Sequence, residues 1–305
     1  MTINTIEYAK LMQKKLDQAA IIGATSGWME ANAGEVIYNG GDEVKIPTMT
    51  TAGLADYDRD KGFVQGGISV KYNTYTLTQD RGRTFMIDAM DLDESGFVAT
   101  SANAIKVFQS EQMIPEIDSY RYSKIAAIAE KAGQNEALAL TADNVVNKLL
   151  EHIMAIQDQI GYDKNLVITI AGKAWALLNN SSEFKRGIAV DNFKQGQVNT
   201  RVYNLNGNII KPAPAGRMKT KYESLDGTTS GQEKGGLKAA DDAKDINWII
   251  TPQSVPIAIS KTDKLRVFTP DVNQQADAYK IDFRVYHDLW IKKGDEKSIF
   301  VCTGA

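Results

Sequence analysis

Residues 76–126, TLTQDRGRTFMIDAMDLDESGFVATSANAIKVFQSEQMIPEIDSYRYSKIA, join two different sequence patterns. The first part continues an alternation of polar and apolar residues that begins at Ile68 and is rich in β-branched and aromatic side chains, as in a β-strand. From Glu94 to Ala132 the apolar residues recur instead at helical spacing. The stretch therefore predicts a long β-ribbon that leads directly into a long helix.

The ribbon has a partner strand in residues 35–50, where an Asn-Gly-Gly turn divides two short alternating runs. Residues 52–67 are polar and glycine-rich, as in a loop tip. At ~3.3 Å per residue, a returning strand over 68–88 would extend well beyond an ordinary domain. Because a two-stranded ribbon is marginal alone in water, we expect it to lie against another surface.

The long helix is expected to begin near Ser95, which can cap its first turn. Pro115 has no N–H to donate and clashes with the preceding turn, so the helix should kink or restart there and continue to Gly133. Helical spacing predicts that one face of the helix is mainly apolar. This face consists of Phe97, Ser101, Ile105, Phe108 and Gln112 before the proline and of Ile117, Tyr120, Lys124, Ile125 and Ile128 after it.

The remainder of the chain mixes helices and strands without a visible linker or internal repeat. Thr141 should cap a second helix through Ile160, and residues 220–245 read as a polar surface loop. Further elements are expected at 166–172 (strand), 173–180 (helix), 199–214 (hairpin), 246–251 (strand) and in three last strands, LRVFTP, DAYKIDFRVYHDLWIKK and KSIFVCT. Together these elements predict an α+β fold.

The composition excludes several classes of protein. The chain has 305 residues, 43% hydrophobic and 24% charged, with a net charge of −3 that gives no support for a free-standing nucleic-acid binder. A single cysteine, Cys302, allows no intrachain disulfide and fits a reducing compartment. No secretory signal and no apolar run of ~20 residues is apparent, so we expect a cytoplasmic protein.

Catalytic patterns are sparse. The two histidines, His152 and His287, have no evident partners, and a packing role is the better interpretation for both. Cys302 has no nearby metal-ligand spacing and is expected to be buried. No phosphate-binding loop or nucleophile elbow is present. We therefore expect no enzyme activity, no cofactor and no metal.

Two phrases, TLTQDRGRTFMID at 76–88 and IPEIDSYRYSKIA at 114–126, resemble the major capsid proteins of tailed bacteriophages with the Hong Kong 97 type shell fold. The order of ribbon, long helix, central α/β region and terminal strands resembles that family too. The resemblance implies five regions: an N-terminal arm (1–34), an extended loop with flanking strands (35–90), a peripheral domain with a spine helix (91–132), an axial domain (133–260) and returning peripheral strands (261–305).

The family implies a structural protein that self-assembles as hexamers and pentamers into an icosahedral shell around the phage genome, in the host bacterial cytoplasm. The partners implied are other copies of the chain, a portal protein and packaged double-stranded DNA contacted non-specifically. The arm is short, which implies a separate scaffolding protein. Two alternatives stay open: an encapsulin-like nanocompartment shell, and an enzyme or binding module built on residues 133–260.

Contacts between subunits are expected at the loop tip, on the returning strand and around the proline. The candidates are Lys61, Asp80, Arg81, Arg83, Pro115, Glu116, Asp118 and Arg121. For each charged residue, a solvated charge or a pair within the chain is the alternative. Some relatives join a loop-tip lysine to a neighbour's asparagine by an isopeptide bond. Lys61 lies in a polar setting that favours an exposed ammonium, so no such bond with Asn273 is expected.

Overall fold

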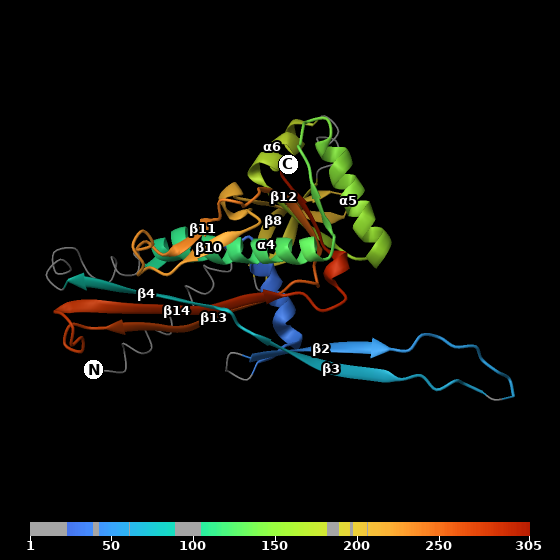
Figure 1. Cartoon of the computed structure of the whole chain (residues 1–305), viewed down its shortest axis with the longest axis horizontal. Helices are drawn as coiled ribbons and strands as arrows, with labels where there is room; N and C mark the ends of the chain where they lie inside the picture. The colour runs from blue at the N-terminus through green and yellow to red at the C-terminus, as the bar shows by residue number, and fades with distance from the viewer. Residues whose placement is uncertain are drawn as a thin grey trace.

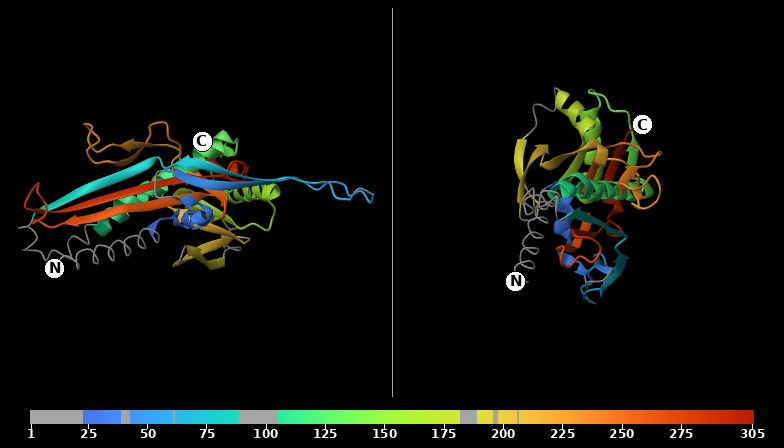
Figure 2. Two further views of the ribbon diagram at one scale, coloured as in Figure 1. Left: turned by 90° about the horizontal axis from the view of Figure 1, so that it is seen from below. Right: turned by 90° about the vertical axis from the view of Figure 1, so that its left-hand side faces the viewer.

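A computed structural model describes residues 23–38, 43–60, 62–88, 105–181, 189–195, 198–205 and 207–305. The molecule is elongated, with a layer of helices and a mixed sheet above a layer of long strands (Figure 1). Hairpin β2–β3, formed by Glu43–Thr51 and Ile68–Thr76, extends from one end of the strand layer. Strands β4, β13 and β14 extend toward the opposite end (Figure 2).

Seven strands of the described chain form one mixed sheet in the order β5-β15-β12-β6-β9-β8-β7. Its central strand β6 is buried along its whole length, as the apolar run LVITIA predicts. The sheet strands are β5 (Asn135–Ala137), β6 (Leu166–Ala171), β7 (Ala189–Gln195), β8 (Val198–Leu205), β9 (Asn208–Ala213), β12 (Ile246–Pro252) and β15 (Phe300–Thr303).

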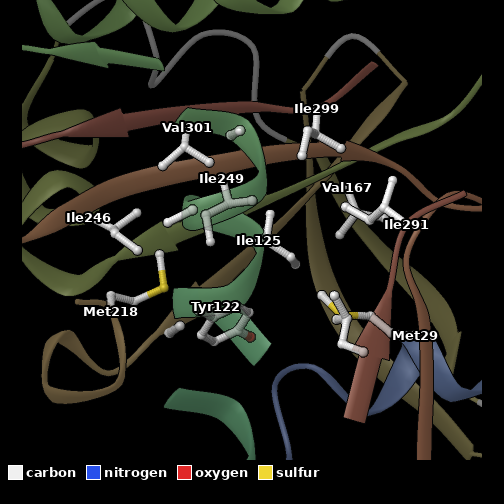
Figure 3. Packing of buried hydrophobic residues seen from close by; sticks show 14 of the residues in the cluster. Met29, Tyr122, Ile125, Val167, Met218, Ile246, Ile249, Ile291, Ile299 and Val301 are labelled. Atoms are coloured by element: carbon white, nitrogen blue, oxygen red, sulfur yellow. The ribbon is translucent and has the colours of Figure 1, made fainter. Parts of the chain in front are cut away.

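Helices pack against this sheet. Helix α5 (Val145–Ile160) buries Val145, Leu149, Ile153 and Ile156 in one cluster with the apolar strand residues and α6 (Gly172–Asn180). A second cluster joins α4 (Ile114–Lys131) to strands β6, β12 and β15 (Figure 3). Figure 3 shows its side chains, including Tyr122 and Ile125 of the helix and Ile249 and Val301 of the sheet.

The lower layer is a three-stranded antiparallel sheet in the order β13-β14-β4, formed by Ile257–Phe268, Ala278–Trp290 and Gln79–Asp88. Its buried residues, Ile281, Phe283 and Val285, pack against the start of the long helix in a separate apolar cluster. The helix therefore lies between the two sheets and contacts both of them.

The prediction of one continuous returning strand of about twenty residues is wrong. The strand is interrupted at Leu77 and Thr78, which separate β3 from β4. Strand β3 pairs with β2, whereas β4 pairs with β14. The Leu77 side chain is buried, and Asp288 accepts hydrogen bonds from the Thr78 N–H (3.0 Å) and hydroxyl (2.9 Å). These contacts turn the chain from the hairpin into the sheet.

The prediction of a kink or restart at Pro115 is met only by a change of helical type, because the backbone stays helical from residue 105 through the proline. Residues 105–108 are α-helical, Gln109–Met113 form a wider π-type turn, and α4 follows with Pro115 in its first turn. The π turn shifts the helical register, which leaves Gln112 exposed rather than on the apolar face. The predicted start near Ser95 lies outside the described residues.

Three further expectations need correction. Helix α5 begins at Val145 rather than near Thr141, because the Asn144 side chain accepts the Thr141 N–H at 2.8 Å and holds a turn there. The predicted loop over 220–245 contains a hairpin of β10 (Tyr222–Leu225) and β11 (Gly236–Ala239). The last strand, β15, lies in the region 261–305 that is expected to return to the peripheral domain, but it pairs with β12 and β5 in the seven-stranded sheet.

Candidate subunit-contact site

The tip of hairpin β2–β3 presents apolar side chains to solvent. Leu54 is 107% exposed and Phe63 90%, and the rings of Tyr57 and Phe63 lie 4.8 Å apart. The large apolar side chains exposed along the hairpin are Met49, Leu54, Tyr57, Phe63, Val64, Ile68, Val70 and Tyr72. An apolar surface of this extent is typical of a protein interface. Lys61 lies outside the described residues.

Arg81 connects three elements within one subunit. Its Nε donates to Glu116 Oε1 at 2.7 Å, and its Nη2 donates to the carbonyl oxygens of Leu225 and Gly236 at 3.0 and 3.1 Å. Strand β4, helix α4 and hairpin β10–β11 are thereby held together. Arg81 and Glu116, predicted as separate contact candidates, are thus brought into one intrachain ion pair.

The other two charged candidates of β4 are exposed. Asp80 accepts two hydrogen bonds from Arg284, at 2.8 and 2.6 Å, and these bonds lower the pKa of its carboxyl. Arg83 donates from Nη2 to the carbonyl oxygen of Glu233 at 3.1 Å. Both side chains reach solvent and are available to a neighbouring molecule.

Asp118 and Arg121 are fully buried in the chain itself. Asp118 accepts the backbone N–H groups and hydroxyls of Thr25 and Ser26 and is paired with Arg217 at 2.9 Å. Arg121 donates to Glu30 at 2.6 Å and to Ser26. The two residues attach the segment before the first strand to α4. Because Asp118 and Arg121 are buried in their own subunit, only the other candidate residues are proposed as contacts between subunits.

Sequence reasoning missed this buried role because it followed only one face of the helix. Positions 118, 122, 125 and 129 share a second face at helical spacing, and all four are buried. The Thr-Ser pair at 25–26 also offers the hydroxyls that a buried carboxylate needs. These two signals together could have identified the buried hydrogen bonds that join Asp118 and Arg121 to the segment from Thr25 to Glu30.

A cavity of about 350 Å³ lies between β4, the start of the long helix and hairpin β10–β11. Aromatic side chains of Phe85, Phe108 and Phe283 line it, together with the charged side chains of Arg81 and Arg83. Phe108 makes edge contacts with both other rings, at 4.9 and 5.6 Å between centroids. The cavity is thus mainly aromatic on one side and charged on another.

His152 and Cys302, which were considered as catalytic candidates, have packing roles. His152 is buried, accepts the Trp248 indole N–H at Nδ1 (3.1 Å) and so donates from Nε2 to Glu136 (2.7 Å). Burial raises the pKa of the Cys302 thiol to about 11, which disfavours the reactive thiolate. Among the described residues, no cluster of three or more His, Cys, Asp or Glu side chains could hold a metal ion.

His287 is buried in β14 with its ring against that of Tyr120, at 5.3 Å between centroids. Burial, and next the nearby Arg121 guanidinium, lowers the pKa of His287 to about 3 from an ordinary value of 6.5. The imidazole is therefore neutral in the folded chain at neutral pH.

No helix within the part of the chain that the structure describes is long and apolar enough to cross a membrane.

This buried histidine should destabilise the fold in acid. The unfolded chain protonates His287 near pH 6.5, whereas the folded chain resists protonation to about pH 3, so stability falls as pH falls through this window. At pH 5 this one group should cost about 2 kcal/mol relative to pH 7. Urea unfolding of the wild type and His287→Gln at both pH values measures the difference. An equal pH dependence of the two proteins would contradict the expectation.

Comparisons with known proteins identify the fold of this chain. No protein-family model and no curated protein sequence matches the chain. Among solved structures, the capsid of cyanophage P-SCSP1u is 10% identical, with a TM-score of 0.59 over 88% of this chain and 85% of that one. The mature capsid of bacteriophage PhiM1 is 11% identical, with a TM-score of 0.55 over 88% and 84%.

A third match is a virus-like particle from Pyrococcus furiosus, which is 13% identical, with a TM-score of 0.53 over 97% of this chain and 99% of that one. At such low identities the likeness shows the fold alone. The matches extend over most of both chains, which is the extent that the resemblance of the quoted phrases implies. The chain therefore has the fold of phage capsid proteins.

Proposed function

We propose that this chain is a major capsid protein that self-assembles as hexamers and pentamers into an icosahedral shell around a phage genome. The observation that carries the proposal is the capsid fold over most of the chain, combined with an apolar hairpin that no described part of its own subunit covers. One chain can fill both ring types if small changes occur at Leu77–Thr78 and around Pro115.

The proposed partners follow from this role. They are other copies of the chain, a separate scaffolding protein, a portal protein and packaged double-stranded DNA contacted non-specifically. The shell would assemble in the host bacterial cytoplasm and become the virion capsid. A structural role without enzyme activity agrees with the packing roles of His152, His287 and Cys302.

The contents of the particles separate this proposal from a compartment shell. A capsid purified from producing cells should contain nuclease-protected DNA, whereas an encapsulin-like compartment should contain a cargo protein. Light scattering first establishes that particles of many copies form. Particles that hold a cargo enzyme and no nucleic acid would favour the compartment.

Arg81→Glu should reduce assembly far more than folding. The substituted carboxylate would repel Glu116 and release hairpin β10–β11 from β4. Loss of this charged contact costs about 1.5–3 kcal/mol of unfolding free energy, which a folded subunit can tolerate. In the shell the same displaced hairpin recurs in every copy, so particle yield should fall at least tenfold.

The measurement for Arg81→Glu is particle yield by sedimentation beside urea unfolding of the subunit. Arg266→Glu is the matched control, because Arg266 is an exposed arginine of β13. Its particle yield should equal that of the wild type. Normal particles from Arg81→Glu at normal yield would show that the ion pair is dispensable for assembly.

The shell should close without covalent bonds between subunits. The Asn273 side chain donates to the carbonyl oxygen of Ala278 at 2.8 Å and is used within its own turn. Mature particles boiled in detergent should therefore run as a single band near 33.5 kDa on a gel. A ladder of larger species would overturn this expectation and would make Lys61 the first residue to substitute.

A further inference from the structure

The cavity beside β4 has the size of a small-molecule binding site. Its volume of about 350 Å³ is at the lower end of the ~300–1,000 Å³ of typical ligand sites. Residues of β4, β14, the start of the long helix and hairpin β10–β11 line it, and we refer to it as the β4 cavity. An occupant of this space would therefore contact all four elements at once.

One side of the β4 cavity is apolar. Phe283 and Val285 lie on the face of β14 that packs against the long helix, from which Ile117 adds aliphatic surface. Phe108 meets Phe85 and Phe283 edge-on, at 4.9 and 5.6 Å between ring centroids. A further ring packs against such rings more favourably than its buried area alone predicts. This side of the cavity therefore favours an aromatic body.

Positive charge lies beside the apolar side. Strand pairing places Arg83 of β4 directly opposite Phe283. The lining carboxylates have partners of their own: Asp80 is paired with Arg284, Glu116 with Arg81, and Asp226 accepts the N–H groups of Thr228 and Thr229. In contrast, no carboxylate of the described residues forms an ion pair with Arg83 or Lys234, which both line the cavity. The β4 cavity therefore favours an anionic group at these two side chains.

The Arg83 guanidinium is held in place by the loop of hairpin β10–β11. A Cβ on Gly227 would lie 2.8 Å from the Arg83 Nη1, and one on Gly235 would lie 3.4 Å from it, so the two glycines leave room for the guanidinium. The Arg83 Nη2 donates to the Glu233 carbonyl oxygen at 3.1 Å. Arg83 makes no other hydrogen bond within the described residues, so its Nε and Nη1 groups can donate to a carboxylate.

His287 supplies a separate observation that points to an occupant. It lines the cavity on the same face of β14 as Phe283, four residues further along the strand, which is about 13 Å at ~3.3 Å per residue. His287 is 1% exposed, and its Nδ1 has no hydrogen-bond partner among the described residues. A buried polar atom without a partner is uncommon in a native protein and costs free energy. The cavity therefore favours an occupant with a second polar group, at the end away from Arg83.

We propose that the β4 cavity binds a small phenolic carboxylate. The carboxylate pairs with Arg83 and Lys234, the ring lies along Phe283 and Val285, and the hydroxyl forms a hydrogen bond with His287 Nδ1. One subunit supplies all of these groups, so binding needs no second copy and does not depend on the proposed function. Because the occupant contacts β4, the long helix and hairpin β10–β11 in the folded chain only, it should stabilise the fold.

The probe is 3-(4-hydroxyphenyl)propionate, titrated into the purified chain and followed by ligand-observed NMR. We expect saturable binding with a Kd of about 1 mM or below, as for a ligand of about twelve non-hydrogen atoms, and a melting temperature that rises with probe concentration. Three analogues test the parts of the probe. 3-Phenylpropionate, which lacks the hydroxyl, and hexanoate, which lacks the ring, should each bind about fivefold more weakly. The uncharged 3-(4-hydroxyphenyl)propanamide should bind at least about tenfold more weakly.

Two variants test the positions of the polar groups. Arg83→Gln should weaken binding of the carboxylate probe at least about tenfold and leave the affinity for the uncharged amide within about twofold, a pattern that a merely distorted cavity would not give. Arg266→Gln is the matched control, because Arg266 is an exposed arginine of β13, and it should bind the probe as the wild type does. His287→Phe keeps a ring at this position and removes Nδ1, so the fivefold preference for the hydroxyl should disappear.

Absence of saturable binding up to about 10 mM probe would overturn this inference and leave the proposed function standing, because particle formation decides that function separately. Equal affinity of the wild type and Arg83→Gln for the probe would overturn it too, as would a hydroxyl preference that His287→Phe retains. Circular dichroism establishes that each variant is folded. If His287→Phe does not fold, the analogue series and Arg83→Gln still decide the outcome.

Discussion

A chain that lacks residues 53–66 should fold normally and form no particles. The Ala52 N–H already donates to the Gly67 carbonyl at 3.0 Å, so joining these two residues closes the hairpin without moving β2 or β3. The deleted segment contributes no residue to any of the four apolar clusters. It carries the exposed aromatic pair, however, so its loss should remove the proposed contact with the neighbouring subunit.

The melting temperature of the shortened subunit should stay within about 2 °C of wild type, as expected for changes at an exposed surface. Ala52→Asn in the same deletion gives an Asn-Gly pair, which favours a two-residue hairpin turn. Gln65→Ala, an exposed polar change in the intact tip, is the control and should assemble normally. A large fall in melting temperature would show that the tip is part of the core, and normal shells would show that it is not a contact.

Asp118→Ala should be the most destabilising single substitution among the candidate residues. It removes the acceptor of the N–H and hydroxyl groups of Thr25 and Ser26 and leaves Arg217 without its carboxylate. Breaking a buried charge pair in this way costs about 3–5 kcal/mol of unfolding free energy. Urea unfolding of the dissociated subunit measures the loss.

Glu130→Ala is the matched control for Asp118→Ala, since Glu130 is an exposed carboxylate of the same helix. Its free energy of unfolding should change by less than about 0.5 kcal/mol. A loss below about 1 kcal/mol for Asp118→Ala would mean that the segment from Thr25 to Glu30 is held mainly by its apolar contacts rather than by the buried carboxylate.

Local patterns were sufficient to predict most helices and strands. The apolar run at 166–172 and the helical face of Val145, Leu149, Ile153 and Ile156 lie in the core as expected. These elements are specified by residues close together in sequence, so periodicity alone identifies them. The resemblance at 76–126 added the fold, which periodicity could not supply.

The errors arise where distant residues decide the conformation. Asp288 ends the ribbon at Thr78 from 210 residues away, and no local signal marks Leu77 as buried. Arg81 holds hairpin β10–β11 through the Leu225 carbonyl, 144 residues later in the chain. Residues 220–245 alone carry no sign of this contact, so their sequence predicts a surface loop. The candidate charges lie on β4 and α4, but their partners depend on tertiary packing, which the local sequence does not reveal.

Negative-stain electron microscopy of the purified protein, alone and with the proposed scaffolding protein, tests the central claim most directly. The claim is that copies of this chain close into a shell through contacts that one subunit cannot make with itself. The predicted result is a population of closed isometric particles of uniform diameter. Monomers and small oligomers under every condition, scaffolding protein included, would contradict it.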